Sequence, residues 1–299
     1  MSNALVAVVS RGIHGASLGY AVQVAAKGAP CTVVDSMGVL APSERLRCLV
    51  VDQDHVQNAL DVLPAFPAAK LVVLCDGLTP ALLAAALREP RVVGFAADGY
   101  DGPRLWEVAY VVRRALYNPP PAPVAELFQW AQTTVTFSAH DAAERDQVVE
   151  AVATVAARFG LPKPLARLAS DAAHHLLANA MRHAPVTPDG RPLYRDADMK
   201  LNDEHAPKLQ VIVDSERLGI EVTDPFGSLH RAKLFSTLLR AHTDTPGGPS
   251  SGSGFQRLHE SASLLRIASH PGVMTRASFV LERNASRRDF ASLYWESEA

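Results

Sequence analysis

One predicted helix carries three side chains that could take part in chemistry. Apolar residues recur at three- and four-residue spacing over residues 165–183, which is typical of a helix with one buried face. His175, Asn179 and Arg182 are separated by four and three residues, so the three lie near one side of that helix. A single helix can in this way present groups to a metal ion and to phosphates together.

Two further motifs follow this helix along the chain. A predicted strand at residues 219–223 runs into Asp224-Pro-Phe-Gly227, where the carboxylate is an acceptor and the glycine permits a turn. An ordinary β-turn explains these four residues equally well, since Asp and Pro favour turns. A Gly/Ser-rich loop then includes Gly252 and Gly254 and leads into a helix. Such a loop can bind an anion through backbone amides, or serve only as a flexible connection.

The paired histidines of the helix do not predict a zinc site. His174 and His175 are adjacent, so their side chains point about 100° apart around the helix. No H-E-x-x-H pattern and no cysteine pair accompanies them. A hydrogen-bonded histidine at or near the surface remains the simple alternative for both.

The first third of the chain predicts a doubly wound α/β domain with a five-stranded parallel sheet, over residues 1–117. Continuous apolar runs, as in buried parallel strands, occur at residues 5–9, 32–34, 48–51, 71–74 and 92–95. Helical segments alternate with them at residues 16–27, 56–63, 80–87 and 103–116. Parallel strands need such crossover helices. No G-x-G-x-x-G follows the first strand, which disfavours a dinucleotide-binding domain.

A proline-rich stretch marks the domain boundary, because proline removes amide donors. We expect a linker with a short helix over residues 118–131, an α+β domain over 132–285 and a C-terminal tail over 286–299. Helices are predicted at residues 141–159 and 165–183, and strands at 134–138, 209–213, 219–223, 264–268 and 277–281.

Composition limits the partners and the compartment. The net charge is −2, with 29 basic and 31 acidic side chains, so no basic surface for nucleic acid is expected. The longest apolar runs fall well short of a bilayer span, so no membrane-spanning helix is expected. Three cysteines cannot all pair, and the start lacks the pattern of a secretion signal. These features favour a cytoplasmic protein.

The alternating pattern of residues 1–117, with Asp52 ending the third strand, resembles the receiver domain of two-component response regulators. The resemblance implies that Asp52 is the phosphoacceptor. Receivers also use an acidic pair after the first strand, a hydroxyl and a lysine. Here the first strand ends at Ser10, and the only lysines within residues 1–117 are Lys27 and Lys70. Phosphate on Asp52 would lack compensating charge. We therefore predict a pseudo-receiver that binds partners, with Asp52 in a local hydrogen bond as the simple alternative.

The helix at residues 165–183 resembles the N box of histidine-kinase-like ATPases, including the anti-sigma-factor kinases. That resemblance implies that Asn179 ligates magnesium and that Arg182 meets phosphate. The family's general-base glutamate is replaced by His175, an imidazole that can act as a base but cannot supply the same negative charge beside a cation. Impaired catalysis is therefore expected.

The two later motifs fall in the order that the same family requires. Asp224 and Gly227 resemble the G1 box, whose aspartate accepts a hydrogen bond from the adenine amino group, although Phe226 stands where a glycine belongs. Gly252 and Gly254 resemble the G2 box over the phosphates. The resemblance implies an α+β sandwich that binds ATP or ADP with magnesium.

Together these features predict a signal-transduction adaptor that works through signalling proteins. The alternatives are an active anti-sigma-type serine/threonine kinase and a scaffold that binds no nucleotide. No histidine lies within residues 141–159, so a dimerisation helix with its own phosphoacceptor is not expected. The segment at residues 103–116, with Val108, Val111 and Val112, could form a homodimer face or could pack in the core.

Overall fold

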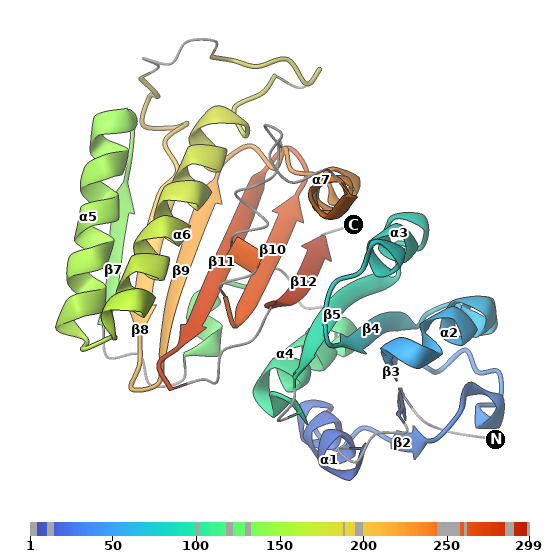
Figure 1. Ribbon diagram of the computed structural model, residues 1–299. Helices are drawn as coiled ribbons and strands as arrows, with labels where there is room; N and C mark the ends of the chain where they lie inside the picture. Colours follow the sequence, from blue (N-terminus) through green and yellow to red (C-terminus); the bar gives the residue numbers. More distant parts are fainter. Residues whose placement is uncertain are drawn as a thin grey trace. The chain divides into compact units, whose positions relative to one another are not determined.

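The structure is a computed structural model that describes residues 5–10, 15–99, 102–117, 122–128, 133–187, 189–194, 200–243, 258–259, 262–284 and 290–297 (Figure 1). The prediction of an α/β protein is confirmed. The chain divides into two compact units. Unit 1 comprises Met1–Pro119 and Phe290–Tyr294, and unit 2 comprises Pro120–Asp289 and Trp295–Ala299. Within the described residues, no helix is both long and apolar enough to cross a membrane.

Unit 1 contains a parallel sheet in the order β2-β1-β3-β4-β5. Its strands are β1 (Val6–Val9), β2 (Cys31–Val34), β3 (Cys48–Asp52), β4 (Lys70–Cys75) and β5 (Val92–Gly99), and β6 (Gly102–Pro103) pairs with β5. Its helices are α1 (Gly15–Ala25), α2 (Val56–Val62), α3 (Pro80–Arg88) and α4 (Leu105–Tyr117), with 3-10 turns η1 (Met37–Val39), η2 (Gln53–His55) and η3 (Leu63–Ala65). The apolar residues of β1, β3 and β4 are buried because both faces of the sheet are covered there, whereas β2 is only partly buried.

One face of the unit 1 sheet packs against α1 and α4. Val6 and Val8 belong to this core, whereas the alternate residues of β1, Ala7 and Val9, are fully buried on the other side. The valines of α4 at positions 108, 111 and 112 are completely buried in the same core. They are therefore not a surface for a homodimer, and core packing explains their spacing.

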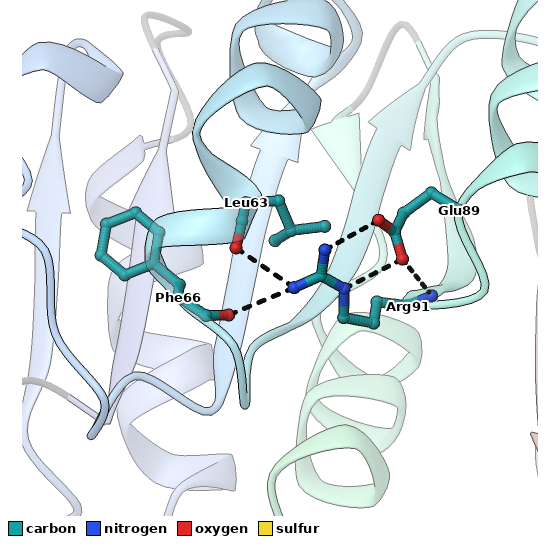
Figure 2. Close-up of polar contacts among 4 residues, drawn as sticks. All are labelled: Leu63, Phe66, Glu89 and Arg91. Atoms are coloured by element: carbon teal, nitrogen blue, oxygen red, sulfur yellow. Dashed lines mark hydrogen bonds and ion pairs between the residues drawn. The ribbon is translucent and has the colours of Figure 1, made fainter.

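A guanidinium joins two loops at the start of β5 (Figure 2). Arg91 Nη1 donates hydrogen bonds to the carbonyl oxygens of Leu63, at 3.1 Å, and Phe66, at 3.4 Å. Its Nε and Nη2 donate to the Glu89 carboxylate, at 2.9 and 2.8 Å. This carboxylate also raises the pKa of Arg91. These hydrogen bonds hold the α3–β5 turn against η3. They also provide a donor for two backbone carbonyl oxygens at the turn that follows α2.

The C-terminal residues 286–299 were expected to form a tail, but residues 292–297 form strand β12 (Ser292–Ser297) instead. Its first part adds to the unit 1 sheet, where Leu293 and Tyr294 pair antiparallel with β5. The sheet is therefore not purely parallel. Ser292 Oγ donates to the buried Glu107 carboxylate and accepts from the Ala97 amide at 2.9 Å. The partner of this strand lies almost 200 residues earlier, so no local pattern marks it.

Unit 2 contains an antiparallel sheet in the order β10-β11-β9-β8-β7. Its strands are β7 (Thr133–Ser138), β8 (Lys208–Val213), β9 (Arg217–Asp224), β10 (Leu264–His270) and β11 (Met274–Glu282). Its helices are η4 (Val124–Leu127), α5 (Ala142–Arg158), α6 (Lys163–Arg182) and α7 (Arg231–Thr243). Figure 1 shows α5 and α6 side by side on one face of this sheet, and α6 contacts β9 and β11. The short helix expected within the linker over residues 118–131 is a 3-10 turn, η4, and residues 129–131 lie outside the described residues.

Candidate functional site

A cavity of about 260 Å³ lies in unit 2 between α6, α7, β9 and β11. Its wall is mostly apolar, with a small number of polar and charged groups, as is usual for a small-molecule site. The residues that line it include Leu176, Asn179, His183, Val222, Asp224, Lys233, Leu234, Thr237, Arg240 and Thr275.

Asn179 reaches the cavity because α6 is amphipathic. Leu176 and Leu177 are buried against the sheet, which leaves Asn179, on the next turn, half-buried at the edge of that apolar face. Its amide lines the cavity together with the side chains of Leu176 and His183. The helix thus delivers one neutral polar group to the site.

Asp224 is the buried acid of the cavity, at the end of β9. Its Oδ1 accepts hydrogen bonds from the backbone amides of Phe226, at 2.9 Å, and Gly227, at 3.3 Å. Burial raises the pKa of Asp224 to about 6, and these amides together with Thr275 on β11 act in the opposite direction. The carboxyl group can therefore change its protonation state near neutral pH.

Gly227 is required by the packing of the turn that holds Asp224. Its φ is +60°, in the left-handed region that favours glycine. A Cβ at this position would lie 2.0 Å from the carbonyl oxygen of His270 and 2.8 Å from the amide nitrogen of Gly272. The turn after β9 is therefore pressed against the β10–β11 turn, which fixes one edge of the cavity.

Phe226, which stands where the resembling family has a glycine, contacts a different part of unit 2. Its ring lies 5.0 Å from the ring of His205, centroid to centroid. His205 Nδ1 lies 2.7 Å from the Tyr194 hydroxyl, within hydrogen-bond distance. The phenyl ring is thus used to hold the connection between α6 and β8, and it is not one of the residues that line the cavity.

The other residues expected on α6 are separated from this cavity. His175 lines a second cavity of about 250 Å³, formed with Arg167, Asp171 and Phe279 among others, and its ring contacts that of His174. Arg182 is exposed and does not line the cavity that holds Asn179. The three side chains are therefore not brought to one point.

Two sets of predicted site residues are not among the described residues of unit 2. Gly252 and Gly254 lie outside the described residues. Asp52 belongs to unit 1, at the end of β3, where its carboxylate lies within hydrogen-bond distance of Nδ1 of the buried His55.

Sequence reasoning missed two cationic residues of the cavity, both on α7. Lys233 and Arg240 are seven residues apart, two helical turns, so they lie on the same side of the helix. Both are exposed, and neither has an ion-pair partner within the described part of the chain. Their spacing can be read from the sequence, but only the packing of α7 beside β9 shows that both residues line the cavity.

No known protein-family model matches the chain, and no curated protein matches it. The geometry of the cavity therefore carries the functional assignment.

Proposed function

We propose that unit 2 binds an adenine nucleotide in the cavity of Asn179 and Asp224 and that the protein is a signalling adaptor with impaired or no catalysis. The observation that carries the proposal is that these two residues, 45 positions apart in the sequence, line the same cavity. The order and spacing of the motifs resemble histidine-kinase-like ATPases. An ionised Asp224 can accept a hydrogen bond from the amino group of adenine.

The size and polarity of the cavity support this assignment. Its volume of about 260 Å³ lies just below the usual range of small-molecule sites, about 300–1,000 Å³, so it suits a base with part of the ribose. Apolar walls from Leu176, Val222 and Leu234 provide surfaces for a flat ring. The phosphates would then extend toward the open rim.

Features of unit 1 support the proposal of a pseudo-receiver that docks partners. Its strand order 2-1-3-4-5 is that of flavodoxin-like folds, to which receivers belong. The Asp52 carboxylate is engaged by His55, and Thr79 caps α3 by accepting from the Leu82 amide. Lys70 begins β4, and Asp52 pairs at the other end of that strand, so this lysine is far from the carboxylate.

Removal of the Asp224 carboxylate is the direct test of the proposed function. In calorimetric titrations of the full chain with ATP, the wild type should bind, and Asp224→Asn should bind at least about tenfold more weakly because the acceptor becomes an amide. Turnover and phosphate transfer should be absent from both. Turnover that His175→Ala abolishes would replace the adaptor with a kinase, and absence of binding in the wild type would leave a scaffold.

The pH dependence of adenosine binding gives a second readout of the same carboxyl group. Adenosine carries no phosphate, so the ionisation of phosphate does not contribute. The adenine amino group needs the ionised carboxylate, and the pKa of Asp224 is raised to about 6. Affinity should therefore be constant above pH 7 and should fall as the pH is lowered through about 6. An unchanged affinity at pH 5 would argue against the assigned contact.

Unit 1 should not accept a phosphoryl group on Asp52. Treatment with acetyl phosphate is expected to give no incorporation that differs between the wild type and Asp52→Asn, because the sequence has no acidic pair directly after β1 and no lysine directly after β5 to stabilise a phosphoaspartate. Intact-mass analysis of both proteins measures this. A mass increase of one phosphoryl group in the wild type that Asp52→Asn lacks would show a working receiver.

A further inference from the structure

More basic than acidic side chains are found among the described residues that line the nucleotide cavity. Among the described residues that line it, Asp224 is the only acidic one, whereas Lys233 and Arg240 add two positive charges from α7. His183 lies on the same wall, and its pKa is lowered by burial and by the nearby charges of Lys233 and Arg182. The wall formed by α6 and α7 is therefore electropositive and suited to an anion.

A magnesium ion does not fit the groups that the described residues supply here. Magnesium prefers oxygen ligands in a near-octahedral arrangement, usually with one or two carboxylates. Asn179 offers one amide oxygen, and the Asp224 carboxylate already accepts two backbone hydrogen bonds in the interior. No group of three or more His, Cys, Asp or Glu side chains that could hold a metal occurs in the described ranges.

Asp171, the acidic residue of α6, does not supply the missing carboxylate ligand. Asp171 lies eight residues before Asn179, which is about 12 Å along the helix axis. It lines the second cavity and is 4.0 Å from Arg167. His175, between the two, offers a nitrogen ligand that magnesium does not favour.

Lys233 and Arg240 supply the charge that a metal ion would otherwise bring. Each is exposed and lines the cavity, on the same side of α7 as Leu234 and Thr237. A guanidinium and an ammonium group both bind phosphate oxygens well. Two cationic side chains beside the cavity also repel a divalent cation.

We propose that this cavity binds adenine nucleotides without magnesium and that Lys233 and Arg240 hold the phosphates in its place. The inference rests on the proposed function, because it assumes an adenine base at Asp224. Binding without the metal that orients a transferable phosphate makes the nucleotide a ligand that shifts conformation rather than a substrate.

Calorimetric titration of the full chain with ADP and with adenosine tests the inference, each in excess EDTA and in excess magnesium chloride. The Kd of ADP should agree within roughly threefold between the two conditions. A strong contact between magnesium and the phosphates would instead change the Kd by about tenfold or more. Lys233→Gln and Arg240→Gln should each weaken the binding of ADP by about tenfold or more, since a charged hydrogen bond to phosphate is lost. Neither variant should change the affinity for adenosine.

Lys208→Gln is the matched control, because Lys208 is exposed on β8 of the same unit and does not line the cavity. It should bind both ligands as the wild type does. ADP binding that requires magnesium, or that strengthens more than about tenfold with it, would overturn the inference while the proposed function stands. ADP affinity that neither α7 variant changes would also overturn it. Failure of both ligands to bind under either condition would reject the proposed function as well.

Discussion

Replacement of Gly227 with alanine is expected to destabilise unit 2 by about 4 kcal/mol or more, a large part of the roughly 5–15 kcal/mol by which folded proteins are ordinarily stable. The added methyl group would lie 2.0 Å from a backbone carbonyl oxygen, that of His270, which cannot move aside like a side chain. The left-handed φ of +60° adds about 1–2 kcal/mol of its own. Denaturant unfolding followed by circular dichroism measures the loss.

Gly272→Ala separates the clash from the backbone conformation. Gly272 has a similar φ of +73° and lies on the opposing turn, but a Cβ there would meet nothing within 4 Å. This variant should lose only the conformational part, about 1–2 kcal/mol. Equal losses in the two variants would mean that the contact with His270 is not what restricts residue 227.

The second large effect is expected at Arg266, which is fully buried in the sheet of unit 2. Its Nε and Nη2 donate to the Glu296 carboxylate at 3.1 and 2.9 Å, and its Nη1 lies 3.7 Å from Glu221 Oε2. Arg266→Met leaves two buried carboxylates without their cation, which should cost about 3–5 kcal/mol in the free energy of unfolding. Arg191→Met is the control, because its ion pair with Asp189 is exposed and should contribute at most about 1 kcal/mol.

The pH dependence of Arg266→Met provides an internal check. Burial raises the pKa of Glu221, and Arg266 acts to lower it. A carboxyl group whose folded-state pKa exceeds its unfolded value opposes folding above that pKa and no longer does so once protonated. The deficit of the variant should therefore be largest near pH 7 and shrink as the pH falls below the folded-state pKa of Glu221. A deficit that is constant between pH 7 and pH 4 would contradict this account.

The helices and strands of this protein could be predicted because their signals are local. The spacing of apolar residues predicts a helix at residues 141–159, and the structure has α5 there, with Asp141 capping it by accepting from the Glu144 amide. The continuous apolar runs of unit 1 likewise give its parallel strands. Each of these patterns depends on residues within a few turns of one another.

The candidate site was predictable only in part. Asn179 and Asp224 were identified through a resemblance, and the tertiary structure brings them to one cavity. His175, on the same side of the same helix as Asn179, instead lines another cavity. His175 and Asn179 are about one helical turn apart, and that step along α6 leads from one small cavity to another, so sharing a helix side does not ensure sharing a site.

The sequence by itself therefore determined most of the helices and strands, together with the candidate acid and amide. Only the tertiary structure decided that Asp52 pairs with His55, that β12 joins β5, and that Lys233 and Arg240 of α7 line the cavity of Asp224. The physical reason is that these contacts depend on which distant segments pack together, and the free energy of that packing is a property of the whole chain rather than of any short stretch.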